Sequence, residues 1–557
     1  MSATEPAAVA ETPDLYGAYP RLSEGQIERL AERGERRATE AGEVLFREGD
    51  EGYDFHAIVA GRVAVVQGQG PDERLIAVHG PGRFLGEVSL LTGQPSFLTA
   101  IVREAGEVLV VPVDELRDLV ARDSALGDLI LRAFLMRRSI LIGLGAGIRI
   151  VGSRYSRDAR RLREFAARNR IPHRWIDVEK DPEAEALLRE LGIAPEETPV
   201  VVWRGEQVLR NPAGEELARV LGLPASHSDD AICDLVVVGS GPAGLAAAVY
   251  GASEGLATVA LDAVAMGGQA GTSSRIENYL GFPSGISGGE LAERAVIQAE
   301  KFGARLSVPS EASGFEQRDG HFAVRLDGDG NRLVEGRAVL MTTGVHYLRL
   351  PVERLDEFEA ESVYYAATEA EALMCAGDPV AVVGGGNSAG QAALFLSRHV
   401  PVVRLLARED DLTRCMSRYL IDQVENAPRI EVMLNTEVRE LVGDDGVLEQ
   451  IVVEDNRDGE RRTISAKAVF VFIGAEPHTG WLGGRLELDE RGFILTGAAM
   501  PGCRLLETSL PGVFAAGDVR SGSIKRVASA VGEGSMAVRL VHEYLADRHS
   551  WQQPGQT

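Results

Sequence analysis

Two glycine-rich turns, each placed between an apolar strand and an alanine-rich helix, constrain the fold of this chain more than any other feature. The first lies in Cys233–Gly244, which reads CDLVVVGSGPAG. Its glycines allow a tight turn and a close backbone approach to a pyrophosphate at the helix N-terminus. The next strand, Ala257–Leu261, ends in Asp262, about 20 residues further on, where a carboxylate accepts hydrogen bonds from ribose hydroxyls. This unit predicts a dinucleotide site.

The second turn lies in Val380–Ala389, which reads VAVVGGGNSA. Its following strand, Val402–Leu406, leads to Arg408 rather than to an acid. A ribose 2′-phosphate prefers a guanidinium, whereas a free 2′-hydroxyl prefers a carboxylate. Arg408 therefore favours NADPH over NADH, although the acidic run Glu409–Asp411 favours the opposite and Arg408 could simply be a solvated charge at a strand end. Two further arginines lie nearby, Arg404 and Arg414.

Length and charge limit the remaining possibilities. The 557 residues suffice for three to four domains at about 150 residues each. The 58 basic and 83 acidic side chains give a net charge of −25, which argues against nucleic acid or a membrane as the main partner. Apolar runs are shorter than the roughly 18 residues of a membrane span, and the acidic N-terminus lacks a signal-peptide pattern. We expect a soluble, cytoplasmic protein without a metal site.

The N-terminal part of the chain differs in pattern from the rest. Residues 1–145 contain short strands punctuated by glycine and flanked by helical segments, which is typical of a β-roll. Residues 148–224 alternate strand and helix, and their last predicted strand, Pro199–Trp203, is followed directly by a predicted helix. The second segment therefore predicts a small α/β domain.

From about residue 230 to 545, the chain resembles the low-molecular-weight thioredoxin reductases, flavoproteins of the class II pyridine nucleotide-disulfide oxidoreductase family. The shared motifs occur in order: Gly239–Gly244, Gly267–Gln269, Ile276–Tyr279, Thr342–Gly344, Gly384–Ala389 and Gly512–Asp518. The resemblance implies two Rossmann-like α/β domains, an FAD domain of residues 230–350 and 470–557 and an NAD(P)H domain of residues 351–469. It also implies a homodimer, with hydride passing from NADPH to flavin N5.

The resemblance and the two turns together indicate the cofactor residues. Asp518 would contact the ribityl chain of FAD, and Lys525–Val527 would face the flavin ring. The expected FAD residues are Gly239, Ser240, Gly241, Pro242, Ala243, Gly244, Asp262, Gly267, Gly268, Gln269, Asn278, Thr343, Gly344, Gly517, Asp518, Lys525, Arg526 and Val527. The expected NADPH residues are Gly384, Gly386, Asn387, Ser388, Ala389, Arg408 and Arg414.

The working dithiol of that family is missing from this chain. Ala366 and Glu369 stand where its two cysteines would lie, and neither can attack a disulfide as a thiolate. We therefore expect an acceptor that needs no protein dithiol. Glu369 would lie near the flavin as an acid or base, or else be a solvent-facing carboxylate at a helix start. Rescue by Cys375 or Cys415 is the alternative, and it keeps thioredoxin-disulfide reduction as a third option.

The two N-terminal domains resemble known modules that have lost reactive groups. Residues 1–145 resemble the cyclic-nucleotide-binding β-roll, with Glu87 in the position that binds the ribose 2′-hydroxyl, but Ser96 replaces the arginine that pairs with the cyclic phosphate. A small-molecule ligand at Gly86-Glu87 is one hypothesis, and a ligand-free packing or dimerisation module is the other. Residues 148–224 resemble glutaredoxin or thioredoxin, with Thr198-Pro199 at the cis-proline position and serines, Ser153 and Ser156, in both cysteine positions.

Together these features predict an NADPH-dependent FAD oxidoreductase of the thioredoxin reductase-like type. Its acceptor would be a quinone, dioxygen, a ferredoxin or a flavodoxin. The rival hypothesis is a redox or nucleotide sensor, or a scaffold, with little turnover.

Overall fold

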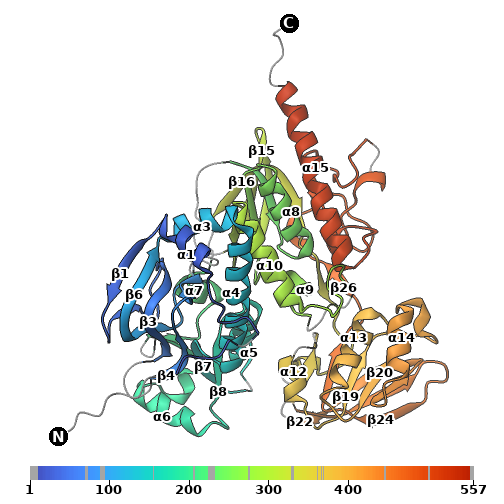
Figure 1. Ribbon diagram of the computed structural model, residues 1–557. Coiled ribbons are helices and arrows are strands. Elements are labelled where there is room, and N and C mark those ends of the chain that lie inside the picture. The colour runs from blue at the N-terminus through green and yellow to red at the C-terminus, as the bar shows by residue number, and fades with distance from the viewer. Residues whose placement is uncertain are drawn as a thin grey trace. The chain divides into compact units, whose positions relative to one another are not determined.

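The computed structural model divides into two compact units, Met1–Ala225 and Ser226–Thr557. Figure 1 shows the elements of both units along the chain. The structure describes residues 10–14, 16–68, 73–87, 94–154, 156–204, 207–223, 232–273, 276, 278–327, 332–359, 362–365, 367, 369–444, 447–499 and 502–551.

The first unit begins with an antiparallel β-roll flanked by helices. Its strands are β1 (Glu35–Thr39), β2 (Val44–Phe46), β3 (Phe55–Gln67), β4 (Arg74–His79), β5 (Phe84–Leu85) and β6 (Thr99–Val111). The sheet order is β1-β6-β3-β4, with β2 paired to β6 and β5 to β3. The helices are α1 (Glu24–Ala31), α3 (Val113–Arg122) and α4 (Ser124–Leu144). Glycine at position 61 is needed where β3 crosses β6, because a Cβ there would lie 2.5 Å from the carbonyl oxygen of Glu104.

The first unit continues with a small sheet covered by short helices. Its elements are β7 (Ile148–Gly152), α5 (Arg157–Arg168), β8 (His173–Asp177), α6 (Pro182–Glu190), β9 (Val200–Trp203), β10 (Gln207–Arg210) and α7 (Gly214–Val220). The order is β10-β9-β7-β8, and the Thr198–Pro199 peptide bond is cis. The prediction that a helix directly follows Trp203 is wrong. The chain first returns as β10, antiparallel to β9, and only two apolar residues, Val208 and Leu209, mark that strand in the sequence.

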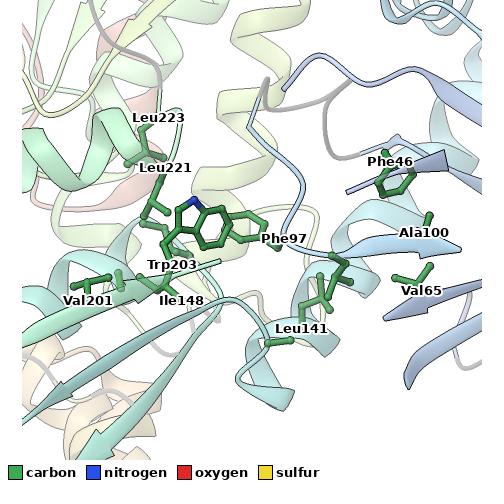
Figure 2. Close-up of a cluster of buried hydrophobic side chains, with 14 of the residues drawn as sticks. Phe46, Val65, Phe97, Ala100, Leu141, Ile148, Val201, Trp203, Leu221 and Leu223 are labelled. Atoms are coloured by element: carbon green, nitrogen blue, oxygen red, sulfur yellow. The ribbon is translucent and has the colours of Figure 1, made fainter. Parts of the chain in front are cut away.

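One apolar core joins the β-roll to this small α/β module. Trp203 is 1% exposed, and its ring meets that of Phe97 edge-on at a centroid distance of 5.4 Å. Leu141 of α4 and Ile148 of β7 belong to the same buried cluster. Figure 2 shows Phe97 beside the indole of Trp203, between the two sheets. The two modules of the first unit therefore share a hydrophobic core.

The second unit contains a mixed seven-stranded sheet that carries the first glycine turn. The strands are β11 (Cys233–Val238), β12 (Thr258–Leu261), β13 (Arg305–Ser307), β14 (Ala312–Arg318), β15 (His321–Leu326), β16 (Leu333–Met341) and β27 (Val513–Ala515). The order is β13-β12-β11-β16-β15-β14, and β27 pairs with β16. The helices are α8 (Pro242–Ser253), α9 (Gly268–Gly271), α10 (Gly288–Lys301) and α15 (Val527–Trp551). The β11 strand lies between β12 and β16 and is parallel to both. It is therefore an interior strand, and the glycine turn that follows it begins between the carboxyl ends of its two neighbours.

A five-stranded parallel sheet carries the second glycine turn. Its strands are β18 (Val363–Tyr364), β25 (Ala468–Val471), β19 (Val380–Val383), β20 (Val403–Leu406) and β21 (Ile430–Met433), in that order. The accompanying helices are α11 (Leu355–Phe358), α12 (Glu369–Met374), α13 (Asn387–Leu396) and α14 (Arg418–Glu425). The sequence predicted that the NAD(P)H domain ends at residue 469 and that the FAD domain resumes at residue 470. The β25 strand, Ala468–Val471, crosses that position and belongs as a whole to this five-stranded sheet.

Two smaller sheets complete the second unit. They are the three-stranded β22 (Thr436–Asp444), β23 (Val447–Asp455) and β24 (Arg461–Ser465), and the pair β17 (Val345–Tyr347) and β26 (Ala475–Pro477). Among the residues described above, no helix combines the length and apolar character of a membrane span.

Replacing Trp203 with alanine tests the shared core. We expect Trp203→Ala to lower the free energy of unfolding of the first unit by about 3–5 kcal/mol, because a fully buried aromatic side chain leaves a cavity. Chemical denaturation followed by limited proteolysis of the first unit measures the effect. The matched control is Leu75→Ala, since Leu75 is 51% exposed. Equal stability losses in the two variants would contradict the shared core.

Candidate functional site

The turn between β11 and α8 is built from backbone contacts that only glycine permits. At Gly239 φ is +99°, and a Cβ would lie 2.4 Å from the carbonyl oxygen of Thr342. At Gly244 a Cβ would lie 1.9 Å from the carbonyl oxygen of Gly239. Gly241, the N-cap of α8, is different: the nearest atom to its Cβ position is 3.9 Å away. The turn is thus closed on the protein side and open where a pyrophosphate would approach.

Asp262, at the end of β12, holds this turn in place. Its Oδ2 accepts a hydrogen bond from Ser240 N at 2.8 Å, and its Oδ1 accepts from Val264 N and Ala265 N at 3.1 Å each. A carboxylate offers about four lone-pair positions. Asp262 therefore fixes the turn, and its hydrogen bonds to ribose stay a prediction.

Thr342, at the end of β16, is a supporting residue that sequence reasoning did not assign. Its Oγ1 donates toward two carbonyl oxygens of the turn, Val238 O at 3.0 Å and Gly239 O at 2.5 Å. The neighbouring Thr343 donates from Oγ1 to His478 O at 3.0 Å, and Gly344 O accepts from His478 N at 3.2 Å. The signal was present in the Thr342–Gly344 motif, but spacing alone did not separate the roles of the two threonines.

The Gly267–Gln269 segment packs directly on the glycine turn. Gly267 N donates to Ser240 O at 2.7 Å, and a Cβ on Gly268 would lie 2.9 Å from Gly241 Cα. Gln269 lies in α9 beside these glycines. Asn278 is exposed and follows the Ile276–Ile286 bridge. The structure therefore brings the predicted Gly267–Gln269 segment to the turn.

The C-terminal helix α15 packs along α8 and brings Asp518 with it (Figure 1). A Cβ on Gly517 would lie 3.0 Å from Ala243 Cβ, which puts the Gly517-Asp518 peptide next to the start of α8. Asp518 is half-buried, and this burial raises the pKa of its carboxyl group, although the positive charge of Lys525 opposes the shift. A polyhydroxyl chain would donate hydrogen bonds to this partly buried carboxyl group. The residues around Asp518 therefore fit the ribityl chain of FAD.

Glu533 of α15 fixes the Asp518 loop and was not predicted. Its Oε2 accepts from Gly517 N at 2.7 Å, and its carboxylate pairs with Arg520. The other predicted residues of this region are exposed or partly exposed. Lys525 lies 4.7 Å from the centre of the Phe493 ring, Arg526 is exposed, and Val527 begins α15.

The second turn, between β19 and α13, has a similar design. At Gly384 φ is +141°, and a Cβ would lie 2.3 Å from the carbonyl oxygen of Phe472. Gly386 is the N-cap of α13, and Ala389 is fully buried against the sheet. Asn387 Oδ1 accepts from Ser417 N at 2.7 Å, so Asn387 braces the helix start, while Ser388 is exposed. This turn offers a second helix N-terminus to a phosphate group.

Opposite charges meet at the end of β20. Arg408 is 76% exposed at its side chain, and its Nε donates to Glu409 Oε1 at 3.1 Å. The other carboxylate oxygen of Glu409 lies 2.7 Å from the Cβ position of Gly385, so this acid faces the glycine turn. Arg414 is 68% exposed and lies 3.5 Å from Asp410. Arg404 pairs with Glu431 on the neighbouring strand, so its role as an NADPH helper stays a prediction.

The predicted dithiol region is only partly visible. Ala366 lies outside the described residues, and Glu369 is placed only by its backbone, as the first residue of α12. The four cysteines are free. Burial raises the pKa of Cys375 to about 12, with nearby Glu371 and Asp378 adding to the shift. Cys375 is therefore not a thiolate near neutral pH.

The predicted ligand position of the β-roll holds an internal ion pair. Glu87 Oε1 lies 2.8 Å from Arg137 Nη1, and the side chains of Arg137 and Glu87 are 9% and 6% exposed. Ser96 Oγ donates to Leu98 O at 2.7 Å. The carboxylate expected to bind ribose is thus already paired. Arg137 was not predicted, although the basic pair Arg137-Arg138 just after the apolar helix pattern of 129–135 was the available signal.

In the small α/β module, the two serines act as structural residues. Ser156 is the N-cap of α5, and its Oγ accepts from Ala159 N at 3.2 Å. Ser153 O accepts from Ser156 N at 3.1 Å. Between them, Arg154 pairs with Asp177 at 2.7 Å. Among the described residues no group of three or more His, Cys, Asp or Glu side chains could hold a metal ion.

Several curated and solved proteins are similar to this chain over more than half of its length. The chain is 32% identical over 361 residues to NADPH-dependent thioredoxin reductase 3 of Arabidopsis thaliana, covering 62% of this chain and 66% of the plant protein. It is 33% identical over 314 residues to thioredoxin reductase of Streptomyces clavuligerus, covering 56% and 94%. Among solved structures, Lactococcus lactis thioredoxin reductase in the FR conformation matches with a TM-score of 0.53 and 26% identity, over 57% and 99% of the two chains. T. acidophilum thioredoxin reductase gives 0.52 and 31%, over 56% and 98%.

Gly241 provides a test of the first turn. We expect Gly241→Ala to fold normally, because its φ of −68° suits alanine and the Cβ comes no closer than 3.9 Å to another protein atom. The methyl group would occupy the pyrophosphate position, so FAD affinity should fall about ten-fold or more, the loss of roughly one hydrogen bond to a charged group. Flavin content after dialysis measures the loss. The control is Gly480→Ala, whose Cβ meets nothing within 4 Å. Full flavin retention in Gly241→Ala would contradict the assignment.

Arg408 provides a test of the second turn. We expect Arg408→Ala to raise the KM for NADPH about ten-fold or more, since a guanidinium–phosphate hydrogen bond is lost, and to change the KM for NADH less than about two-fold. Steady-state kinetics with both nucleotides measure the difference. Arg404→Ala is the matched control, because Arg404 pairs with Glu431. An equal effect of Arg408→Ala on the KM values for both nucleotides would contradict a contact with the 2′-phosphate. Arg408 would then be only a solvated charge at the end of β20.

Two family matches agree with the geometry. Residues 36–123 match the cyclic nucleotide-binding domain family. Residues 233–534, more than half of the chain, match the pyridine nucleotide-disulphide oxidoreductase family. The chain therefore belongs to the pyridine nucleotide-disulphide oxidoreductase family, as an NAD(P)H-dependent flavoprotein oxidoreductase with FAD and NADPH as cofactors.

Proposed function

We propose that this oxidoreductase passes electrons from NADPH to an acceptor that requires no protein dithiol. The observation that carries the proposal is the placement of its sulfur atoms. Cys233, Cys375, Cys415 and Cys503 are the only cysteines, and all four are free. Even the two nearest in the chain, Cys375 and Cys415, are separated by β19, α13 and β20. A dithiol relay needs two neighbouring sulfurs, one of them a thiolate.

Burial further reduces the redox use of two of these cysteines. Cys233 lies in β11, where burial raises the pKa of its thiol to about 12, and its Sγ donates to Glu335 O at 3.1 Å. Cys375 has a similarly raised pKa. Cys415 is exposed and follows the short turn Leu412–Arg414 of the nucleotide domain. No two of the four cysteines are spaced in the sequence as a CxxC dithiol motif would require.

The chain's own contribution is to bind and orient the two nucleotides. When bound, FAD accepts a hydride from NADPH and later delivers the two electrons to the acceptor. The Gly239–Gly244 turn, Asp262 and Asp518 would hold FAD. The Gly384–Ala389 turn and Arg408 would hold NADPH, and Glu369, at the start of α12, would supply an acid or base beside the ring. The acceptor would be a quinone, dioxygen, a ferredoxin or a flavodoxin.

The names of the relatives favour a second candidate, thioredoxin-disulfide reduction. The matched relatives include several thioredoxin reductases, and exposed Cys415 would then have to act with a further thiol. A sensor with little turnover remains the non-enzymatic rival.

We also propose three features of the organisation of the chain. The functional protein is a homodimer. Residues 148–224 form a thioredoxin-like module without redox cysteines. The nucleotide domain spans residues 351–469, inserted in an FAD domain of residues 230–350 and 470–557.

Anaerobic titration with NADPH distinguishes these functions. Flavin alone takes up two electrons, so about one equivalent of NADPH should bleach the visible flavin band completely. A flavin with a working disulfide takes up four, so that enzyme would need about two equivalents. We expect about one equivalent, followed by rapid reoxidation with a quinone such as menadione.

Cysteine variants provide the control for this titration. In Cys375→Ser/Cys415→Ser the stoichiometry and the quinone rate should match those of the unchanged protein. A requirement for two equivalents that falls to one in the double variant would support thioredoxin-disulfide reduction. A flavin that stays oxidised with excess NADPH would support the sensor.

A further inference from the structure

The β-roll contains an apolar cavity that the oxidoreductase reaction does not use. Its volume is about 70 Å³, several times the roughly 10–15 Å³ that one water molecule needs. Most of the lining is aliphatic or aromatic and comes from β2, β3, β4, α4 and the segment before β6. Representative wall residues are Phe46, Val65, Ile76, Phe97, Leu98 and Ile140. Such walls favour a ring or a short hydrocarbon frame.

The acidic and the basic side chain that line this cavity, Glu87 and Arg137, already neutralise each other. Glu87 and Arg137 both line it, and they form the buried ion pair at 2.8 Å. Arg137 Nε also donates to Ala18 O at 2.7 Å, and its Nη1 donates to Phe84 O at 3.1 Å. Removing one partner of a buried pair leaves an uncompensated charge. Among the described residues that line the cavity the one guanidinium is already paired, so an anionic ligand would add an uncompensated charge, and Glu87 is not free to bind ribose hydroxyls.

Two buried nitrogen atoms in the cavity wall lack a partner among the residues that the structure describes. They are Arg137 Nη2 and His79 Nδ1, in side chains that belong to residues 8% and 2% exposed. Burial together with the nearby Arg137 and Arg83 lowers the pKa of His79 well below its ordinary value, so its ring is neutral. A buried N–H without an acceptor is costly. The role of His79 Nδ1 depends on its tautomer, whereas Arg137 Nη2 can only donate, so the group missing at Arg137 is an oxygen acceptor.

We propose that the β-roll binds a small, uncharged ring compound that carries a carbonyl oxygen. The ring lies among the apolar wall residues, and the oxygen accepts a hydrogen bond from Arg137 Nη2. This ligand class differs from a cyclic nucleotide, whose phosphate would need an unpaired cation. The proposal does not depend on which acceptor the flavin reduces.

Occupation of the cavity is coupled to the α/β module by one aromatic contact. Phe97 lines the cavity on one side and meets Trp203 of β9 edge-on on the other (Figure 2). The segment before it is held by hydrogen bonds from Ser96 N to Asp50 O at 3.0 Å and from Gly49 N to Ser96 O at 2.6 Å. Phe97 cannot move without changing the surroundings of Trp203, which therefore reports the ligand.

Calorimetric titration of the full-length, FAD-loaded protein tests the site. The probe is 1-indanone, compared with indane, indane-1-carboxylate and cyclic AMP. We expect 1-indanone to bind with a Kd on the order of 10–1000 µM, as suits a ligand of about ten non-hydrogen atoms. Indane, which lacks the oxygen, should bind about ten-fold more weakly. The carboxylate and cyclic AMP should produce no heat. Binding of cyclic AMP without binding of 1-indanone would overturn the proposal.

Two variants locate the ligand and test the charge argument. Ala77→Leu fills the cavity from β4 and should abolish 1-indanone binding, whereas Ala38→Leu on the exposed face of β1 should not. Glu87→Gln frees the charge of Arg137 and should allow indane-1-carboxylate to bind. The matched control is Glu107→Gln, which breaks the exposed pair with Arg36. Unchanged 1-indanone binding in Ala77→Leu would place the ligand elsewhere and refute the site.

Fluorescence tests the coupling. With Trp175, Trp481 and Trp551 replaced by phenylalanine, Trp203 is the only remaining indole. Its emission should change with 1-indanone and saturate at the calorimetric Kd. In the Phe97→Leu background the compound should still bind, while the emission change should fall at least about two-fold, because the ring contact is lost. A full emission change without Phe97 would refute this route.

Discussion

The backbone contact between α15 and α8 is the constraint on which the flavin site depends. At Gly534 a Cβ would lie 2.1 Å from the carbonyl oxygen of Ala243, so the two helices touch without any side chain between them. This contact joins segments from opposite ends of the second unit. Because Gly517 also lies against Ala243, the Asp518 carboxyl is held next to the dinucleotide turn. A larger residue at either glycine would separate the helices and move Asp518 away from the turn.

Local sequence was sufficient for the nucleotide turns because their geometry is set by glycine. Only glycine tolerates the positive φ at Gly239 and Gly384 together with a carbonyl oxygen 2.4 Å and 2.3 Å from the respective Cβ positions. Apart from Asp234 near the start of β11, the strand before each turn is apolar, as expected of a parallel strand buried on both faces. For these elements the chain pattern and the fold agree.

Long-range contacts explain what local sequence could not show. The β10 strand has too few apolar residues to be recognised, and it forms because β9 offers an unpaired edge. Arg137 follows an apolar stretch of α4, so its partner Glu87, which precedes β6 in the chain, could only be found in three dimensions. Arg404 looked like a nucleotide ligand by proximity to Arg408, yet its neighbour across the sheet is Glu431.

The two nucleotide-like sites differ physically in how firmly their charges are paired. Arg408 is 76% exposed whereas its partner Glu409 is 21% exposed, so the guanidinium side of this pair is open to solvent. Arg137 and Glu87 form a buried pair, and breaking it costs about 3–5 kcal/mol. The first arrangement leaves a cation available for an anionic cofactor. The second keeps its cation paired with Glu87, which is why the proposed ligand of the β-roll is uncharged.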